Sequence, residues 1–117
     1  MSRTSWHVTY EGQAVTVSRR ARPVFDVAGE TVLPDACRVR IAHQVRQDLW
    51  RALQNVRGFA PAVQIERHDT GLHVTAGGQL ACSAPVDQLR ARIQHVLDDP
   101  QNRLRWVTYG RKKKAVH

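Results

Sequence analysis

The sequence predicts a single α+β domain in which two helices pack on one face of an antiparallel sheet. Two observations predict this class. Short segments of alternating β-branched and aromatic residues are separated by turn residues, and two longer segments carry apolar residues at every third or fourth position. The 117 residues, 42% hydrophobic and 24% charged, suit one globular domain. We assign that domain to residues 1–110 and expect residues 111–117 to form a basic, flexible tail.

Hairpins are expected in the first third of the chain. Residues 5–10 and 14–18 alternate as strands do, and residues 11–13, which include Gly12, supply the turn between them. Residues 24–27 and 31–33 flank a glycine-containing segment and predict a second, shorter hairpin.

The clearest hairpin pattern lies in the middle of the chain. Residues 62–68 and 72–76 are rich in β-branched residues and flank Asp69-Thr70-Gly71. The glycine pair at 77–78 is expected to end the second strand, because glycine weakens strand interiors.

The first helix is expected after Pro34, with Asp35 as its N-cap and Gly58 at its C-terminal end. Trp50 is expected to widen its apolar face. Residues 37–41 also alternate, so this segment is either a strand or the first turns of the helix. The apolar positions that define the helix are Ile41, Val45, Leu49, Leu53 and Val56.

The second helix is expected to begin at Ser83 as N-cap, with Pro85 in its first turn. The sequence Asp98-Asp99-Pro100 is expected to end it, because proline cannot continue a helix. Its apolar face consists of Val86, Leu89, Ile93, Val96 and Leu97.

Residues 103–109 alternate and predict a closing strand. From residue 14 the expected order is then strand, helix, strand, strand, helix, strand, which is the ferredoxin-like βαββαβ order preceded by an extra N-terminal strand. A pair of strand-strand-helix units, with the last strand added at an edge, is the alternative.

The charge of the chain points to an anionic partner. The formal net charge is +8, and six cations lie between positions 103 and 114 without an acidic residue among them. Such a cluster repels itself unless a polyanion neutralises it and releases counterions. The alternatives are a solvated basic face that serves solubility and, for the Arg-Lys-Lys-Lys run, a nuclear localisation signal.

A second basic cluster, Arg19-Arg20-Ala21-Arg22, follows the first hairpin. If it lies near the C-terminal segment, the two clusters form one surface for about five phosphates, with a log–log salt slope near −4. Trp106 is expected to be a core residue and Tyr109 a base-stacking residue. The predicted nucleic-acid-binding residues are Arg19, Arg20, Arg22, Arg103, Arg105, Tyr109, Arg111, Lys112, Lys113 and Lys114.

No motif for catalysis, for a metal or for a cofactor occurs in the sequence. His68 and His73 flank a turn and are expected to be surface residues rather than metal ligands. Cys37 and Cys82 match no metal spacing and are expected to be reduced core thiols, with a disulfide between them as the alternative. We therefore expect a protein that is not an enzyme and that needs neither metal nor cofactor, with a small metal-dependent or thiol enzyme as the alternative.

No apolar run of about 18 residues and no apolar signal segment occur, which predicts a cytoplasmic protein without a membrane span. The strands at 63–68 and 72–76 contain no aromatic residue other than histidine, which excludes the base-stacking sheet of an RRM. The resulting hypothesis is a small non-enzymatic protein that binds RNA or single-stranded DNA. The alternative is an accessory subunit or inhibitor that docks on an acidic protein surface.

Overall fold

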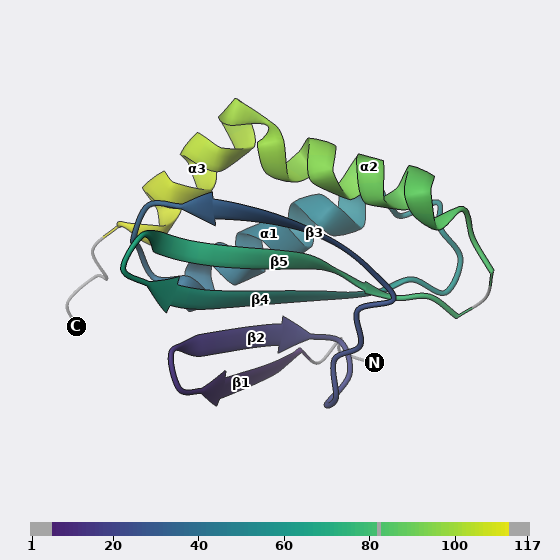
Figure 1. The fold of residues 1–117 in the computed structure, drawn as a ribbon, viewed down its shortest axis with the longest axis horizontal. Helices are drawn as coiled ribbons and strands as arrows, with labels where there is room; N and C mark the ends of the chain where they lie inside the picture. The colour runs from purple at the N-terminus through teal and green to yellow at the C-terminus, as the bar shows by residue number, and fades with distance from the viewer. Residues whose placement is uncertain (1–5, 82, 113–117) are drawn as a thin grey trace, which may run out of the picture.

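The chain folds as a five-stranded antiparallel sheet with three helices on one of its faces (Figure 1). The computed structural model describes residues 6–81 and 83–112. The strands follow the order β1-β2-β4-β5-β3 across the sheet. The elements are β1 (His7–Glu11), β2 (Ala14–Ser18), β3 (Val27–Leu33), α1 (Arg38–Ala52), β4 (Ala60–His68), β5 (Gly71–Gln79), α2 (Val86–Asp98) and α3 (Pro100–Gly110). An α+β fold with an antiparallel sheet is thereby confirmed.

Two of the predicted hairpins are confirmed. β1 pairs with β2 across a two-residue turn, where Gly12 has φ 59°, a value that favours glycine. β4 pairs with β5 over nine residue pairs, from Ala60 opposite Gln79 to His68 opposite Gly71. The glycine pair at 77–78 does not end β5, which continues to Gln79. Glycine fits here because the backbone of β3 comes too close to β5 to leave room for a side chain. A Cβ atom on Gly77 would lie 1.9 Å from the carbonyl oxygen of Val27.

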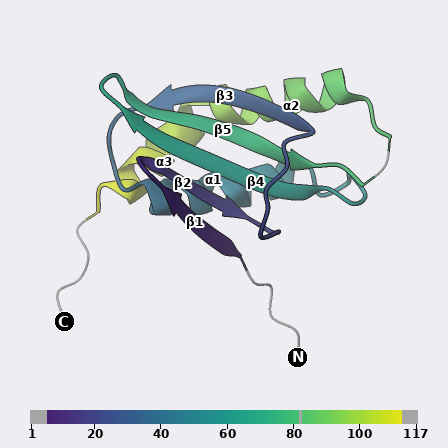
Figure 2. The same cartoon turned by 60° about the horizontal axis from the view of Figure 1, so that its bottom comes forward.

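The prediction of a second short hairpin over residues 24–33 is wrong. Only β3 forms there, and it pairs with β5 at the far edge of the sheet. The segment from Arg19 to Asp26 crosses the ends of β4 and β5 to reach that edge (Figure 2). It is held by backbone hydrogen bonds from Arg19 N–H to the Pro61 carbonyl and from Asp26 N–H to the Gly78 carbonyl.

Helix α1 begins at Arg38, so the ambiguous residues 37–41 belong to the helix rather than to a strand. Asp35 is not its N-cap. Cys37 occupies that position without a side-chain cap, and its N–H donates to the Gly110 carbonyl at the end of α3. The helix ends at Ala52, earlier than predicted, and Gly58 lies in the loop that follows.

Helix α2 confirms the predicted apolar face but not its predicted cap. The N-cap position is Pro85 rather than Ser83, and no side chain caps the helix. Four of the five predicted apolar positions are buried, namely Leu89, Ile93, Val96 and Leu97.

The predicted closing strand at residues 103–109 is wrong, because this segment lies within helix α3. Asp99 is the N-cap, and its Oδ1 accepts hydrogen bonds from the N–H groups of Gln101 and Asn102. Pro100 occupies the first turn, where proline is favoured. The sequence that ends α2 therefore also starts α3. The fold has three helices instead of two, and the ferredoxin-like order is not confirmed.

Side chains from α2 and α3 cover the edge of β3 where a closing strand would have paired. The Gln94 amide bonds both the N–H and the carbonyl of Glu30, and the Arg103 guanidinium donates to the Val32 carbonyl. These groups satisfy backbone atoms that a neighbouring strand would otherwise bond.

The core lies between the sheet and the helices. Alternate residues of β2, β4 and β5 point to it, as strand geometry requires, and α1 contributes Ile41, Val45 and Leu49. Trp106 is fully buried, which confirms its predicted core position although it comes from a helix. Within the described residues, the longest helix has 15 residues, and no helix has the length and apolarity that a membrane span requires.

Candidate nucleic-acid interface

Arg103 and Arg105 are both engaged in contacts within the fold. The Arg103 guanidinium donates to the Thr31 hydroxyl and to the carbonyls of Val32 and Leu97. Arg105 pairs with Asp48 at 2.8 Å between Nη2 and Oδ2. Both arginines therefore hold α3 against its neighbours; Asp48 neutralises Arg105, whereas Arg103 bonds only uncharged acceptors.

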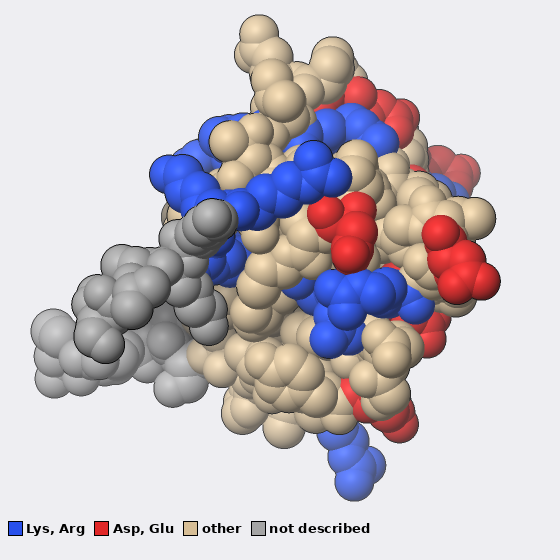
Figure 3. Space-filling model, turned by 90° about the vertical axis from the view of Figure 1, so that its left-hand side faces the viewer, with Lys and Arg blue, Asp and Glu red and all other residues tan. Residues whose placement is uncertain are grey.

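Tyr109, Arg111 and Lys112 lie together at the C-terminal end of α3. The guanidinium of Arg40 and the ammonium of Lys112 lie 5.7 and 5.9 Å from the centre of the Tyr109 ring, and Arg40 also donates to the Lys112 carbonyl. Arg111 donates to the Asp35 carbonyl. Figure 3 shows cationic side chains gathered on this end of the molecule, with acidic side chains between them. Lys113 and Lys114 lie outside the described residues.

Within the described residues, the two predicted basic clusters lie at opposite ends of the sheet. Arg19, Arg20 and Arg22 follow the last residue of β2. At the other end of β2, Arg38 donates to the Gln13 carbonyl in the β1–β2 turn, close to the Cys37–Gly110 contact. The five residues of β2 separate these ends by about 17 Å. The described residues of the two clusters therefore do not form one surface.

A different set of cations and rings does come together, between α1 and the β1–β2 hairpin. Trp6, Arg19, Arg46 and Trp50 line a hollow of about 440 Å³, which we call the Trp–Arg hollow. The guanidinium carbons of Arg46 and Arg19 lie 4.3 and 5.5 Å from the centre of the Trp6 ring. Trp50 is 49% exposed, so it does not widen the apolar face of α1 as predicted.

Local geometry explains why these four side chains meet. The β1–β2 register, continued by one residue beyond His7 and Ser18, places Trp6 opposite Arg19 on the face toward α1. Arg46 and Trp50 are four residues apart on α1 and therefore lie on one face of the helix, one turn apart.

The Trp–Arg hollow carries positive charge without a compensating carboxylate. Among residues 6–81 and 83–112, neither Arg19 nor Arg46 forms an ion pair, whereas Arg51, Arg67, Arg90 and Arg105 do. The Arg46 Nε atom is buried and has no hydrogen-bond partner within the described part of the chain. A buried donor without an acceptor is costly, which makes it a place where a ligand oxygen would be favoured.

Electrostatic effects on nearby groups agree with this picture. Burial, followed by repulsion from Arg19, lowers the pKa of Arg46 from its ordinary value. Burial, followed by repulsion from Arg46, lowers the pKa of His43, which lies three residues before Arg46 on α1. In both groups burial is the larger cause, and a neighbouring arginine adds to it.

Sequence reasoning missed Trp6, Arg46 and Trp50 as site residues. Forty residues separate Trp6 from Arg46, and only the packing of α1 on the sheet brings them together. One sequence signal was present, because Trp50 stands beside the polar face of α1, between Leu49 and Arg51.

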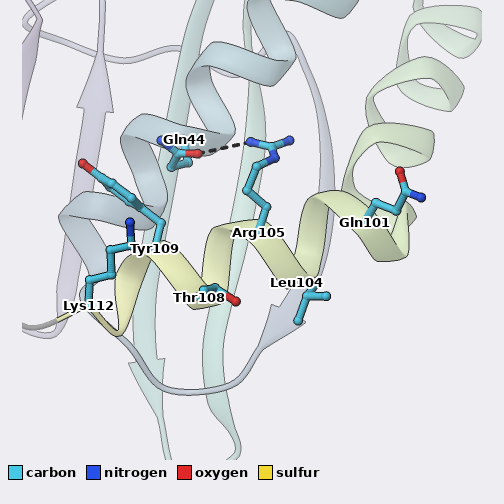
Figure 4. A pocket seen from close by; sticks show the side chains of 7 residues that line it. All are labelled: Gln44, Gln101, Leu104, Arg105, Thr108, Tyr109 and Lys112. Atoms are coloured by element: carbon cyan, nitrogen blue, oxygen red, sulfur yellow. Dashed lines mark hydrogen bonds between the residues drawn. The ribbon is translucent and has the colours of Figure 1, made fainter.

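A second depression lies between α3 and α1, with a volume of about 470 Å³ (Figure 4). Leu104 and Thr108 line it from α3, and Arg105 bonds the side-chain oxygen of Gln44 within it. Its surface is mostly apolar and its arginine is neutralised by Asp48. It therefore suits an apolar side chain better than an anion.

The histidine pair on the β4–β5 hairpin is not part of a metal-binding cluster. The rings of His68 and His73 lie 4.1 Å apart, with Glu66 bonded to His68 and Thr70 bonded to His73. No group of three or more metal-ligating side chains occurs in the ranges 6–81 and 83–112. Cys37 is a free thiol, while its predicted alternative partner Cys82 lies outside the described residues.

No family model, curated protein or solved structure matches this chain.

Proposed function

We propose that this protein binds RNA or single-stranded DNA without catalysing a reaction, and that the Trp–Arg hollow is its principal contact. The observation that carries the proposal is the combination of two uncompensated arginines with a half-exposed tryptophan. Phosphates bind to guanidinium groups, and unpaired bases stack on exposed aromatic rings.

The shape of the hollow supports a single strand rather than a duplex. Its volume of about 440 Å³ is large enough for one nucleotide unit and is open to solvent at the edge of α1. The Trp50 ring offers a flat apolar surface to a base, while Arg19 and Arg46 are available to the phosphate. Arg20 and Arg22, both exposed, follow Arg19 and extend the positive surface into the loop after β2.

Fluorescence anisotropy with labelled oligouridylate and oligothymidylate tests the proposal. Trp50→Ala is expected to weaken binding by about 5- to 150-fold, the range that corresponds to loss of one base–aromatic stack. Replacing Arg19 and Arg46 together with alanine is expected to flatten the log–log salt slope by about 1.4, since each phosphate neutralised on a single strand contributes about 0.7.

Arg90→Ala is the matched control, because it also removes one positive charge from a helix but pairs with Asp87 on α2. If Arg46→Ala and Arg90→Ala weaken binding equally, only net charge matters and the hollow is not the site. If neither the parent chain nor any variant binds an oligonucleotide at low salt, the function itself is wrong.

The depression beside α3 favours a second candidate function, the docking of an acidic protein. Leu104 is 71% exposed at its edge, and α3 together with Arg111 and Lys112 contains no acidic residue. A partner helix with apolar and acidic side chains would complement both features. Recovery of a stoichiometric protein partner after nuclease treatment, lost in Leu104→Asp but kept in Trp50→Ala, would support this function over the first.

A further inference from the structure

The two edges of the sheet differ in how they are protected. Gln94 and Arg103 cover the edge strand β3. β1, at the opposite edge, is exposed at all five of its residues and has no neighbour on its outer side within the described part of the chain. Natural edge strands are commonly protected by lysine, by proline or by a bulge. β1 contains neither residue type, and its pairing with β2 is regular.

Hydrogen-bonding groups on the outer side of β1 belong to Val8 and Tyr10. In a hairpin with a two-residue turn, the pair that closes the turn exchanges hydrogen bonds, and bonded and non-bonded pairs then alternate. Glu11 opposite Ala14 closes this turn. The backbones of His7, Thr9 and Glu11 therefore face β2, and those of Val8 and Tyr10 face outward.

The side chains of β1 are complementary to those of a second, antiparallel β1. A two-fold axis through Thr9 places Thr9 opposite Thr9, Val8 opposite Tyr10 and His7 opposite Glu11. Threonine pairs and pairs of aromatic and β-branched residues are cross-strand pairs that stabilise sheets, and an imidazole N–H of His7 can donate to the Glu11 carboxylate. At this register all five residues of β1 have a partner, and the outward backbone groups of Val8 and Tyr10 bond one another.

Exposed apolar surface on β1 supports the same pairing. Tyr10 is 66% and Val8 37% exposed, and both lie on the face toward α1. In the paired arrangement the two copies of each residue form one apolar strip across the two-fold axis, so that surface becomes covered.

We propose that two copies of this chain associate through antiparallel β1–β1 pairing centred on Thr9, which joins their sheets into one of ten strands. The pairing is an isologous interface, in which the same surface of each copy meets itself. It does not depend on the nucleic-acid proposal, because β1 contributes no residue to the Trp–Arg hollow.

Charge changes on β1 test the pairing by sedimentation velocity over a concentration series. The parent chain is expected to shift from its monomer mass of 13.3 kDa to twice that mass. Val8→Lys combined with Tyr10→Lys places like charges opposite each other and should keep the chain monomeric. Val8→Lys combined with Tyr10→Glu places opposite charges there and should restore the dimer. A parent chain that stays monomeric throughout overturns the inference, even if β1 binds a strand of another protein.

Disulfide formation tests the register. With Cys37 and Cys82 replaced by serine, Thr9→Cys should give a cross-linked dimer under mild oxidation, because opposed residues of a non-bonded pair lie about 4.5 Å apart at Cα, within disulfide reach. His7→Cys is the control, since four residues of offset place its two copies about 13 Å apart. Equal cross-linking at both positions would show that the chains meet in a different way.

Discussion

Replacing Asp48 with alanine is expected to destabilise the fold, because this carboxylate accepts the indole N–H of the buried Trp106. Asp48 Oδ2 lies 2.6 Å from Trp106 Nε1 and 2.8 Å from Arg105 Nη2. Its side chain is only 10% exposed, so water has little access to replace it. The carboxylate thus joins α1 to α3, the helix that stands where a strand was expected.

The magnitude follows from these two contacts, because the third, to the exposed Arg51 at 3.4 Å, adds little. A buried donor left without an acceptor costs about 1–3 kcal/mol, and the Arg105 pair, whose guanidinium side chain is 46% exposed, adds no more than about 1 kcal/mol. We expect Asp48→Ala to lower the free energy of unfolding by about 1–4 kcal/mol. This is a large part of the stability of a small domain, and it corresponds to a Tm lower by about 10 °C.

Urea unfolding followed by circular dichroism measures this difference. The control is the same substitution in a Trp106→Phe background, which has no indole N–H to satisfy. There the cost of Asp48→Ala should fall to about 1 kcal/mol, that of the exposed pairs with Arg105 and Arg51. An equal loss in both backgrounds would refute the argument that the indole hydrogen bond makes Asp48 important.

Two further predictions concern β5 and the surroundings of the hollow. Gly77→Ala should lower the free energy of unfolding by more than about 3 kcal/mol in the same urea assay, because the Cβ atom of the alanine would overlap the Val27 carbonyl. Gly12→Asn is the control: this position is open and tolerates asparagine, so the free energy of unfolding should fall far less. Burial and Arg46 lower the pKa of His43, so His43 binds a proton more readily in the unfolded chain than in the folded one. The contribution of His43 to stability is therefore complete above pH 6.5 and is lost as pH falls through its pKa in the folded chain. A phosphate in the hollow would raise that pKa, so oligonucleotide affinity should increase as pH falls below 6.5, and His43→Gln should remove most of this dependence in anisotropy titrations.

The strands and helices that carry strong patterns were predictable from the sequence, while α3 was not. Leu104, Trp106 and Thr108 alternate with Arg103, Arg105 and Val107 in a segment rich in strand-forming residues. The helix is decided instead by the Asp99 cap, by Pro100 in the first turn and by burial of one large side chain, Trp106, against α1. Local preference and tertiary packing disagreed, and packing determined the outcome.

The candidate site was less predictable than the fold, for a physical reason. A sequence shows which residues carry positive charge, but only the folded structure shows which of them lie beside an acceptor or a carboxylate. Arg103 and Arg105 seemed suited to phosphates, and each finds acceptors within the fold. Arg46 is one of several polar residues of α1, and no sequence pattern distinguishes it from the others. In the fold, its buried Nε has no hydrogen-bond partner in the described part of the chain.

The distinction between compensated and uncompensated arginines also separates the roles of the two faces of α1. On the side toward α3, Asp48 neutralises Arg105, and that contact serves stability. On the side toward the β1–β2 hairpin, Arg46 lies against Trp6 and near Arg19; its burial and, second, the repulsion from Arg19 lower its pKa and are a cost to the folded chain. An anion in the Trp–Arg hollow would remove this cost, so the same repulsion that weakens the free protein would strengthen its attraction for a phosphate. Arg46→Met, which keeps much of the side-chain volume, should therefore raise the stability of the free chain while weakening oligonucleotide binding; a variant that loses both would show that Arg46 serves the fold.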